Sequence, residues 1–148
     1  MNAKLLYFDT SALRPLFLHE ERSRRVIQSV RRHRAAVRIT RFGYAELINA
    51  MACAVFRGDI SAEEFSAAVA QVDSDLRSHD VVMADLLWRA TLDRAVALSL
   101  EHTPALGNRM LDVLHISSAL ELGAKNFVTY DNRQIGLARR VGLKTISP

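Results

Sequence analysis

The chain has 148 residues, a formal net charge of +4 and 49% hydrophobic residues, so it is long enough to bury a core and we expect one domain over residues 1–148. Its single cysteine, Cys53, excludes a disulfide within the chain and a cysteine-based metal site. No apolar run reaches the roughly 18–20 residues of a membrane span, and the short start of the chain does not resemble a signal peptide. We therefore expect a cytoplasmic protein.

Short apolar runs alternate with longer helical patterns in the first two thirds of the chain. Strands are predicted over residues 5–8, 36–40 and 81–83, and helices over 11–18, 20–34, 42–57 and 85–100. A further helix is predicted to open at Ser61, because Glu64 lies three residues on and can complete a capping box. Residues 103–108, which include Pro104 and Gly107, predict a loop.

The last third of the chain continues the alternation. A helix is predicted over residues 110–122, a strand over 127–129, a helix up to residue 141 that Asn132 can cap, and a last strand over 143–146. Strands that alternate with helices predict an α/β fold, in which a mainly parallel sheet lies between two layers of helices. In such folds the functional site lies at the carboxyl ends of the strands.

A basic block interrupts an otherwise acidic sequence. Residues 22–41 contain eight arginines and no acidic residue, so the remainder of the chain is net negative. Such a block favours a polyanionic partner such as RNA, with Arg31, Arg32 and Arg34 as candidate contacts. The alternative is a solvated helix face that binds nothing specific.

Four acidic residues lie where an α/β fold would place a site. Asp9 and Asp131 come at or just after the end of a predicted strand, while Glu46 and Asp112 lie inside apolar helical segments. An acidic residue among apolar neighbours needs a partner or access to solvent. Each one alone is more simply explained as a capping or edge carboxylate, but four at parallel points indicate a shared site.

The segments around these acids resemble, in the same order, the four acidic motifs of PIN domains. The segments are Tyr7-Phe8-Asp9-Thr10-Ser11, Ala45-Glu46-Leu47, residues 111–119 and Val128-Thr129-Tyr130-Asp131. Residues 123–131 and the Gly142-Leu143 ending are especially similar to VapC-type toxins. The resemblance extends over essentially the whole chain.

This resemblance implies a three-layer PIN-like domain that hydrolyses RNA phosphodiester bonds and leaves a 5′-phosphate and a 3′-hydroxyl. It also implies the toxin half of a toxin–antitoxin pair, with a cognate antitoxin as partner, and a homodimer. Two carboxylates about 4 Å apart repel by roughly 4 kcal/mol at an effective dielectric of about 20, so four of them need a cation. Oxygen ligands without cysteine favour Mg²⁺ or Mn²⁺.

Roles can be assigned on the same basis. We expect Asp9 and Asp112 to bind the metal directly, and Glu46 and Asp131 to act through water or at a second metal position. Thr129 precedes Asp131 by two residues and is a candidate supporting partner, as are Thr10 and Ser11. These three hydroxyl residues and Arg109, which precedes Asp112 by three, complete the predicted site. His115 could touch substrate, but a buried and hydrogen-bonded histidine is the better interpretation.

Two other functions remain open. One is a PIN-like module that binds RNA or protein without cutting. The other is a phosphoaspartate-type phosphohydrolase with Asp9 as nucleophile, although that chemistry usually needs a carboxylate at the position of Ser11. An antitoxin tail is expected to use apolar surface on the first helices, made by Leu13, Leu16, Phe17 and Leu18.

Overall fold

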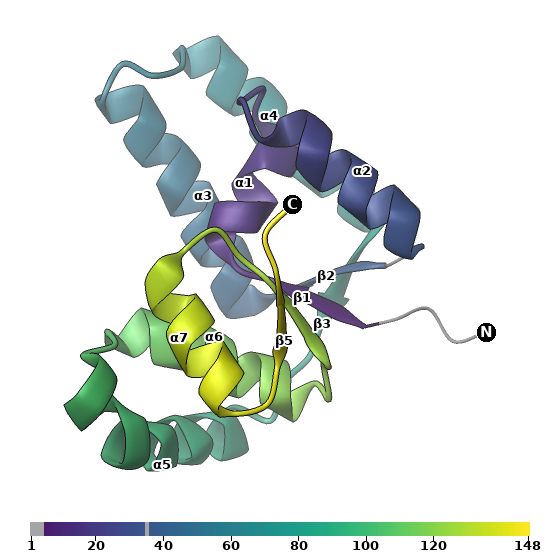
Figure 1. The fold of residues 1–148 in the computed structure, drawn as a ribbon. Coiled ribbons are helices and arrows are strands. Elements are labelled where there is room, and N and C mark those ends of the chain that lie inside the picture. Colours follow the sequence, from purple (N-terminus) through teal and green to yellow (C-terminus); the bar gives the residue numbers. More distant parts are fainter. Residues whose placement is uncertain (1–4, 35) are drawn as a thin grey trace.

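A five-stranded, entirely parallel sheet forms the centre of the molecule, and it confirms the predicted α/β fold (Figure 1). The structure is a computed structural model that describes residues 5–34 and 36–148. Residues 1–4, part of the N-terminal segment that we expect not to be a signal peptide, lie outside the described residues. In spatial order the strands are β3 (Val81–Ala84), β2 (Val37–Thr40), β1 (Leu6–Phe8), β4 (Asn126–Val128) and β5 (Lys144–Ile146).

Helices cover both faces of the sheet (Figure 1). One layer contains α1 (Thr10–Phe17), α2 (Ser23–His33), α3 (Arg41–Phe56) and α4 (Ala62–Ser78), and the other contains α5 (Trp88–Leu106), α6 (Met110–Glu121) and α7 (Asn132–Arg140). The alternation of side chains along β1 divides the core accordingly, since Leu6 and Phe8 pack in the first layer and Tyr7 in the second.

The centre of the sheet brings the carboxyl ends of β1 and β4 together. The two strands are paired from Leu6 with Asn126 to Phe8 with Val128, and the Asp9 N–H donates to the Val128 carbonyl at 3.2 Å. Because all strands run in the same direction, the segments that follow β1, β2 and β4 leave the sheet at one edge. The predicted acidic residues belong to these segments and to α6.

Two predicted helix starts can be compared with the structure. The capping box of α4 is confirmed, because Ser61 Oγ accepts from the Glu64 N–H at 3.0 Å and the Glu64 carboxylate accepts from the Ser61 N–H at 2.7 Å. The prediction that Asn132 caps α7 is wrong. Asp131 is the cap, and its side chain accepts from the Arg133 N–H at 2.8 Å.

The predicted loop over residues 103–108 is wrong in its first half, because α5 continues through Pro104 to Leu106. Proline has no N–H for the carbonyl four residues earlier, which belongs to Leu100. Leu100 is 76% exposed, so the missing hydrogen bond lies on the solvent side of the helix and within its last two turns. The helix ends at Gly107, which has a φ of 64° and donates its N–H to Thr103 at 2.8 Å.

The expected apolar surface on the first helices is largely absent. Leu13 and Leu18 are buried, and Leu16 and Phe17 are partly buried against the same core. The exposed large apolar side chains lie instead mainly on and around α5 and at the start of α6: Leu87, Leu92, Val96, Leu100, Met110 and Leu111, with Phe56 at the end of α3. In residues 5–34 and 36–148 no helix combines the length and apolar character that crossing a membrane requires.

Candidate active site

All four predicted acidic residues line one pocket of about 200 Å³ at the carboxyl edge of the sheet. Asp9 follows β1, Asp131 caps α7 after β4, Glu46 lies in α3, and Asp112 lies in the first turn of α6. We call this hollow the carboxylate pocket. It brings together residues that are up to 122 positions apart in the chain.

Asp9 is almost completely buried and is held by three donors. Its carboxylate accepts from Ser11 Oγ at 2.6 Å, from Thr129 Oγ1 at 2.6 Å and from the Ala12 N–H at 3.1 Å. Burial raises the pKa of Asp9 above its ordinary value, although the charge of His115 and these hydrogen bonds oppose the rise. Asp9 is therefore held in one orientation, and burial makes its charged form costly.

Glu46 is half-buried and has a different environment. His115 Nε2 lies 2.6 Å from Glu46 Oε1, and the Thr10 hydroxyl donates to the same oxygen. Burial acts to raise the pKa of Glu46, but the hydrogen bond and charge of His115, with the Thr10 hydrogen bond, outweigh it and leave the pKa lowered. Glu46 is therefore held as a carboxylate.

His115 joins Glu46 to the core. An ionised carboxylate can only accept, so His115 Nε2 carries the proton that is shared with Glu46. The other ring nitrogen, Nδ1, lies 2.9 Å from the Tyr7 hydroxyl, and burial raises the pKa of Tyr7 so that this hydroxyl stays protonated. Nδ1 accepts from the Tyr7 hydroxyl when the ring is neutral and donates to its oxygen when the ring is charged, so this contact fits either state of the ring. The histidine is 1% exposed, which agrees with the interpretation of a buried, hydrogen-bonded side chain.

Asp112 and Asp131 are fixed by backbone donors at two helix starts. The Asp112 carboxylate accepts from the Arg109 N–H at 3.1 Å, and that of Asp131 accepts from the Arg133 N–H. The positive end of a helix favours a carboxylate at these places. Each side chain keeps further oxygen lone pairs for a ligand.

The three predicted supporting hydroxyls contact the acidic residues. Thr10 and Ser11 line the pocket, while Thr129 is fully buried behind it. Thr129 Oγ1 donates to Asp9 and accepts from the Asp131 N–H at 2.9 Å, so one side chain connects two of the four acidic residues. Ser11 Oγ also accepts from the Tyr130 N–H at 2.9 Å.

Sequence reasoning missed part of the pocket wall. Gln134 and Arg133, in the first turn of α7, line it beside Asp131. Gln134 is 5% exposed, and its Oε1 has no hydrogen-bond partner among residues 5–34 and 36–148. The spacing could have indicated Gln134, since it lies three residues after Asp131 and such positions share a helix face.

The basic candidates lie in different places. Arg109, predicted to meet a phosphate or to pair with a carboxylate, lines the carboxylate pocket. Arg31 and Arg32 lie in the last turn of α2, and Arg34 forms its left-handed end with a φ of 47°. None of these three side chains lines the carboxylate pocket.

The donors of the carboxylate pocket suit a hard cation in kind, because they are four carboxylates and one unpartnered amide oxygen. In the described part of the chain, however, no three His, Cys, Asp or Glu side chains lie close enough together to form a metal-binding group. The hydrogen bonds explain the separation of two of them. Asp9 is turned toward Ser11 and Thr129, and Glu46 toward His115 and Thr10.

Comparison with known proteins agrees with this architecture. The family model described as "PIN domain" matches residues 6–140. Among solved structures, the chain is similar to PAE2754 from Pyrobaculum aerophilum, with a TM-score of 0.61 and 21% sequence identity over 97% of this chain and 83% of that chain. At this identity the likeness shows a shared fold. No curated protein matches the sequence.

Proposed function

The chain belongs to the PIN-domain family, whose members are generally nucleases, and from that premise we propose that it is a metal-dependent endoribonuclease. One observation carries the proposal: Asp9, Glu46, Asp112 and Asp131 line a single pocket at the carboxyl edge of the parallel sheet. Such a concentration of carboxylates is unfavourable unless a cation or protons neutralise it.

In this proposal Asp9 and Asp112 hold Mg²⁺ or Mn²⁺ directly, and Glu46 and Asp131 contribute through water or at a second position. A divalent cation supplies a bound water of lowered pKa and neutralises charge on a phosphodiester. Ser11 and Thr129 keep the Asp9 carboxylate oriented, and the unpartnered Gln134 Oε1 is available to accept a hydrogen bond from water.

Two exposed arginines at the pocket supply positive charge that can bind the negative charge of a phosphodiester. Arg109 and Arg133 both line the pocket, and in the described chain neither has an ion-pair partner. We propose that they bind the phosphate groups of the RNA. Hydrolysis would leave a 5′-phosphate and a 3′-hydroxyl, as the resemblance to the family implies.

The phosphoaspartate alternative is not favoured. Ser11 occupies the position where that chemistry usually needs a second carboxylate.

The first prediction tests cleavage. We expect the purified chain to cut single-stranded RNA with Mg²⁺ or Mn²⁺, to stop in excess EDTA and to recover when metal is restored. Asp9→Asn and Asp112→Asn should each lower the cleavage rate to background, because each removes a charged metal ligand. Asp93→Asn, at an exposed position in α5, is the matched control and should cut at the original rate.

Three outcomes would contradict the proposal. Undiminished cleavage in excess chelator would exclude the metal mechanism. Cleavage by Asp9→Asn at the original rate would instead show that the site assignment is wrong. A chain that binds RNA but never cuts it would be the silent binding module.

We further propose that this nuclease is the toxin of a toxin–antitoxin pair and that it forms a homodimer. The support is the similarity of residues 123–131 and of Gly142-Leu143 to VapC-type toxins. Sedimentation of the purified chain tests the dimer, and expression in cells tests the toxin.

A further inference from the structure

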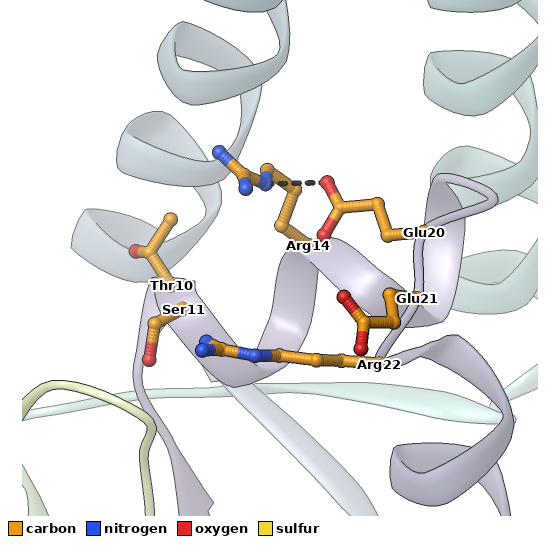
Figure 2. A pocket seen from close by; sticks show the side chains of 6 residues that line it. All are labelled: Thr10, Ser11, Arg14, Glu20, Glu21 and Arg22. Carbon is orange, nitrogen blue, oxygen red and sulfur yellow. Dashed lines mark ion pairs between the residues drawn. The ribbon is translucent and has the colours of Figure 1, made fainter.

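A second, larger hollow adjoins the carboxylate pocket. It has a volume of about 460 Å³ and is lined by Thr10, Ser11, Arg14, Glu20, Glu21 and Arg22 (Figure 2). Thr10 and Ser11 also line the carboxylate pocket, so the first turn of α1 forms a wall common to both hollows. A ligand that occupies the carboxylate pocket can therefore extend across this wall.

Two of the four charged side chains that line the second hollow form an ion pair with each other, and the other two form none among the described residues. Arg14 Nε lies 2.7 Å from Glu20 Oε1, so these two groups largely neutralise each other. Arg22 has no ion-pair partner among the described residues, and Figure 2 shows its guanidinium group directed toward Ser11. Its guanidinium carbon lies 4.1 Å from the centre of the Tyr130 ring. Glu21 is the one carboxylate there without an ion pair in this part of the described chain.

A third hollow continues in the direction of α2. It has a volume of about 360 Å³, lies between α2 and the residues at the end of β5, and is lined on α2 by Arg25, Gln28, Ser29, Arg32 and His33. Arg25 and Arg32 are seven residues apart, which places them on the same side of the helix about 10 Å from each other. Neither has an ion-pair partner within residues 5–34 and 36–148.

Tyr130 connects the second hollow with the third. Arg22 stacks on its ring, and its hydroxyl donates to the carbonyl of Pro148, which lines the third hollow. Arg25 lines this third hollow together with Pro148, whose carbonyl accepts from the Tyr130 hydroxyl. Arg22, Arg25 and Arg32 thus form a continuous row that begins at the wall of the carboxylate pocket.

We propose that this row is the track on which single-stranded RNA leaves the active site, with Arg22, Arg25 and Arg32 binding successive parts of its phosphate backbone. The inference rests on the proposed function, since the track ends where the scissile phosphodiester is proposed to lie. Its anionic ligand is then the flanking backbone of the substrate itself. Binding to RNA phosphates accounts for the exposed positions of these three arginines without a protein partner.

The proposal divides the arginine block into two groups. Arg24 and Arg31 precede Arg25 and Arg32 by one position each, so they point about 100° away around the helix. Both are exposed and neither lines the third hollow, so Arg31, a candidate contact from the sequence alone, lies outside the proposed track. The two pairs have equal charge, equal spacing and the same helix, which makes Arg24 and Arg31 a matched control.

The second prediction measures RNA binding with a labelled single-stranded oligoribonucleotide in EDTA over a series of salt concentrations. Arg25→Gln with Arg32→Gln should weaken binding and lower the slope of log affinity against log salt by about 1.4, because each lost phosphate contact removes about 0.7. Arg24→Gln with Arg31→Gln should leave the slope near that of the original chain. Thermal melting of both variants checks that the fold is retained.

Equal losses from both pairs, or a larger loss from Arg24 and Arg31, would overturn the track. A competition with polyglutamate gives a further test. If polyglutamate of the same total charge displaces the RNA, and if the Arg25 and Arg32 variant loses affinity for both polymers equally, α2 binds acidic proteins and the track is overturned. Cleavage by the unchanged chain is scored separately. A chain that cuts RNA without using Arg25 and Arg32 contradicts only the track, and one that binds along them without cutting contradicts only the proposed nuclease.

Discussion

Asp9 and Glu46 share one pocket, but their surroundings shift their pKa values in opposite directions. Burial dominates at Asp9 and raises its pKa, whereas His115 and Thr10 overcome burial at Glu46 and lower its pKa. Without a bound cation, burial therefore makes the ionised form of Asp9 unfavourable. A cation bound beside it would relieve this cost, so stability and the proposed activity make opposite demands on the same side chain.

The third prediction follows from the raised pKa of Asp9. A carboxyl group with a higher pKa in the folded state contributes stability that is complete below its unfolded pKa of about 3.9 and is lost as pH rises through the folded pKa. Asparagine cannot ionise, so Asp9→Asn should melt at a higher temperature than the original chain at neutral pH in EDTA. For a domain of this size each kcal/mol gained raises the melting temperature by about 2–4 °C.

The advantage of Asp9→Asn should shrink as the pH is lowered, because the original Asp9 then becomes protonated as well. Asp93→Asn, which removes an exposed carboxylate, should show no such pattern. A variant at Asp9 that melts lower at every pH would mean that the hydrogen bonds from Ser11, Thr129 and Ala12 outweigh the cost of burying the charge.

Among secondary-structure elements, the contact between α3 and α6 depends strongly on His115. This α6 residue donates to Glu46 of α3 and is hydrogen-bonded to the Tyr7 hydroxyl of β1, so a single ring connects three elements under the pocket. Phe42, also of α3, packs on the ring with 4.7 Å between centroids. The position of Glu46 is thereby determined from within the core.

The fourth prediction compares two substitutions of this histidine. His115→Gln retains an N–H close to the position of Nε2, whereas His115→Leu retains the volume without a donor. Leucine should leave the Tyr7 hydroxyl buried without a partner, at a cost of about 1–3 kcal/mol in urea unfolding, and should release Glu46. We expect Mn²⁺ affinity, measured by calorimetry, to fall in the leucine variant and to be largely restored in the glutamine variant. Equal Mn²⁺ affinity in both would show that His115 only fills the core.

The elements themselves were largely predictable from local patterns. β1 and β3 are short apolar runs, and the acidic residues follow strands or interrupt apolar helices, so their order in the chain predicted that they would meet at one edge of the sheet. The failures have local physical causes. The carbonyl that Pro104 leaves without a donor belongs to Leu100, an exposed residue, so the helix can continue past the proline. Asp131 caps α7 in place of Asn132, because the Asp131 carboxylate accepts from the Arg133 N–H.

Contacts between distant side chains were beyond the reach of these patterns. The bond between Tyr7 and His115 joins residues 108 positions apart, and neither spacing nor periodicity relates them. The serines of α6 show the same limit. Ser117 donates to the carbonyl of Thr91 in α5, so a polar residue in a buried helix is satisfied by a neighbour that only the fold brings near.

Across the whole molecule, charge and apolar surface lie apart. Arginines without an ion pair among the described residues follow α2 from the edge of the carboxylate pocket, and exposed apolar side chains such as Val96 and Leu100 gather on α5. The prediction of an apolar surface on the first helices was wrong, because the apolar side chains of α1 pack into the core around Leu13. Composition records how many apolar residues there are, and only packing decides which remain outside.

The last prediction concerns the cell. If the chain acts as the proposed toxin, its host needs a partner that blocks the carboxylate pocket or the proposed arginine track. An antitoxin could do so by offering a lysine or arginine to the carboxylates in place of the metal. Expression of the chain alone in its native host should therefore arrest growth, and co-expression of the adjacent gene should restore it.

Two controls separate toxicity from cleavage itself. Asp112→Asn, expressed to the same level, should not arrest growth, because the arrest depends on the cleavage that Asp112 supports. Asp93→Asn should be as toxic as the original chain, because that exposed carboxylate lies in α5 and does not line the pocket. If the chain cuts RNA when purified but leaves its host unharmed when expressed alone, the toxin proposal is wrong. A role in routine RNA processing would then agree better with the same pocket.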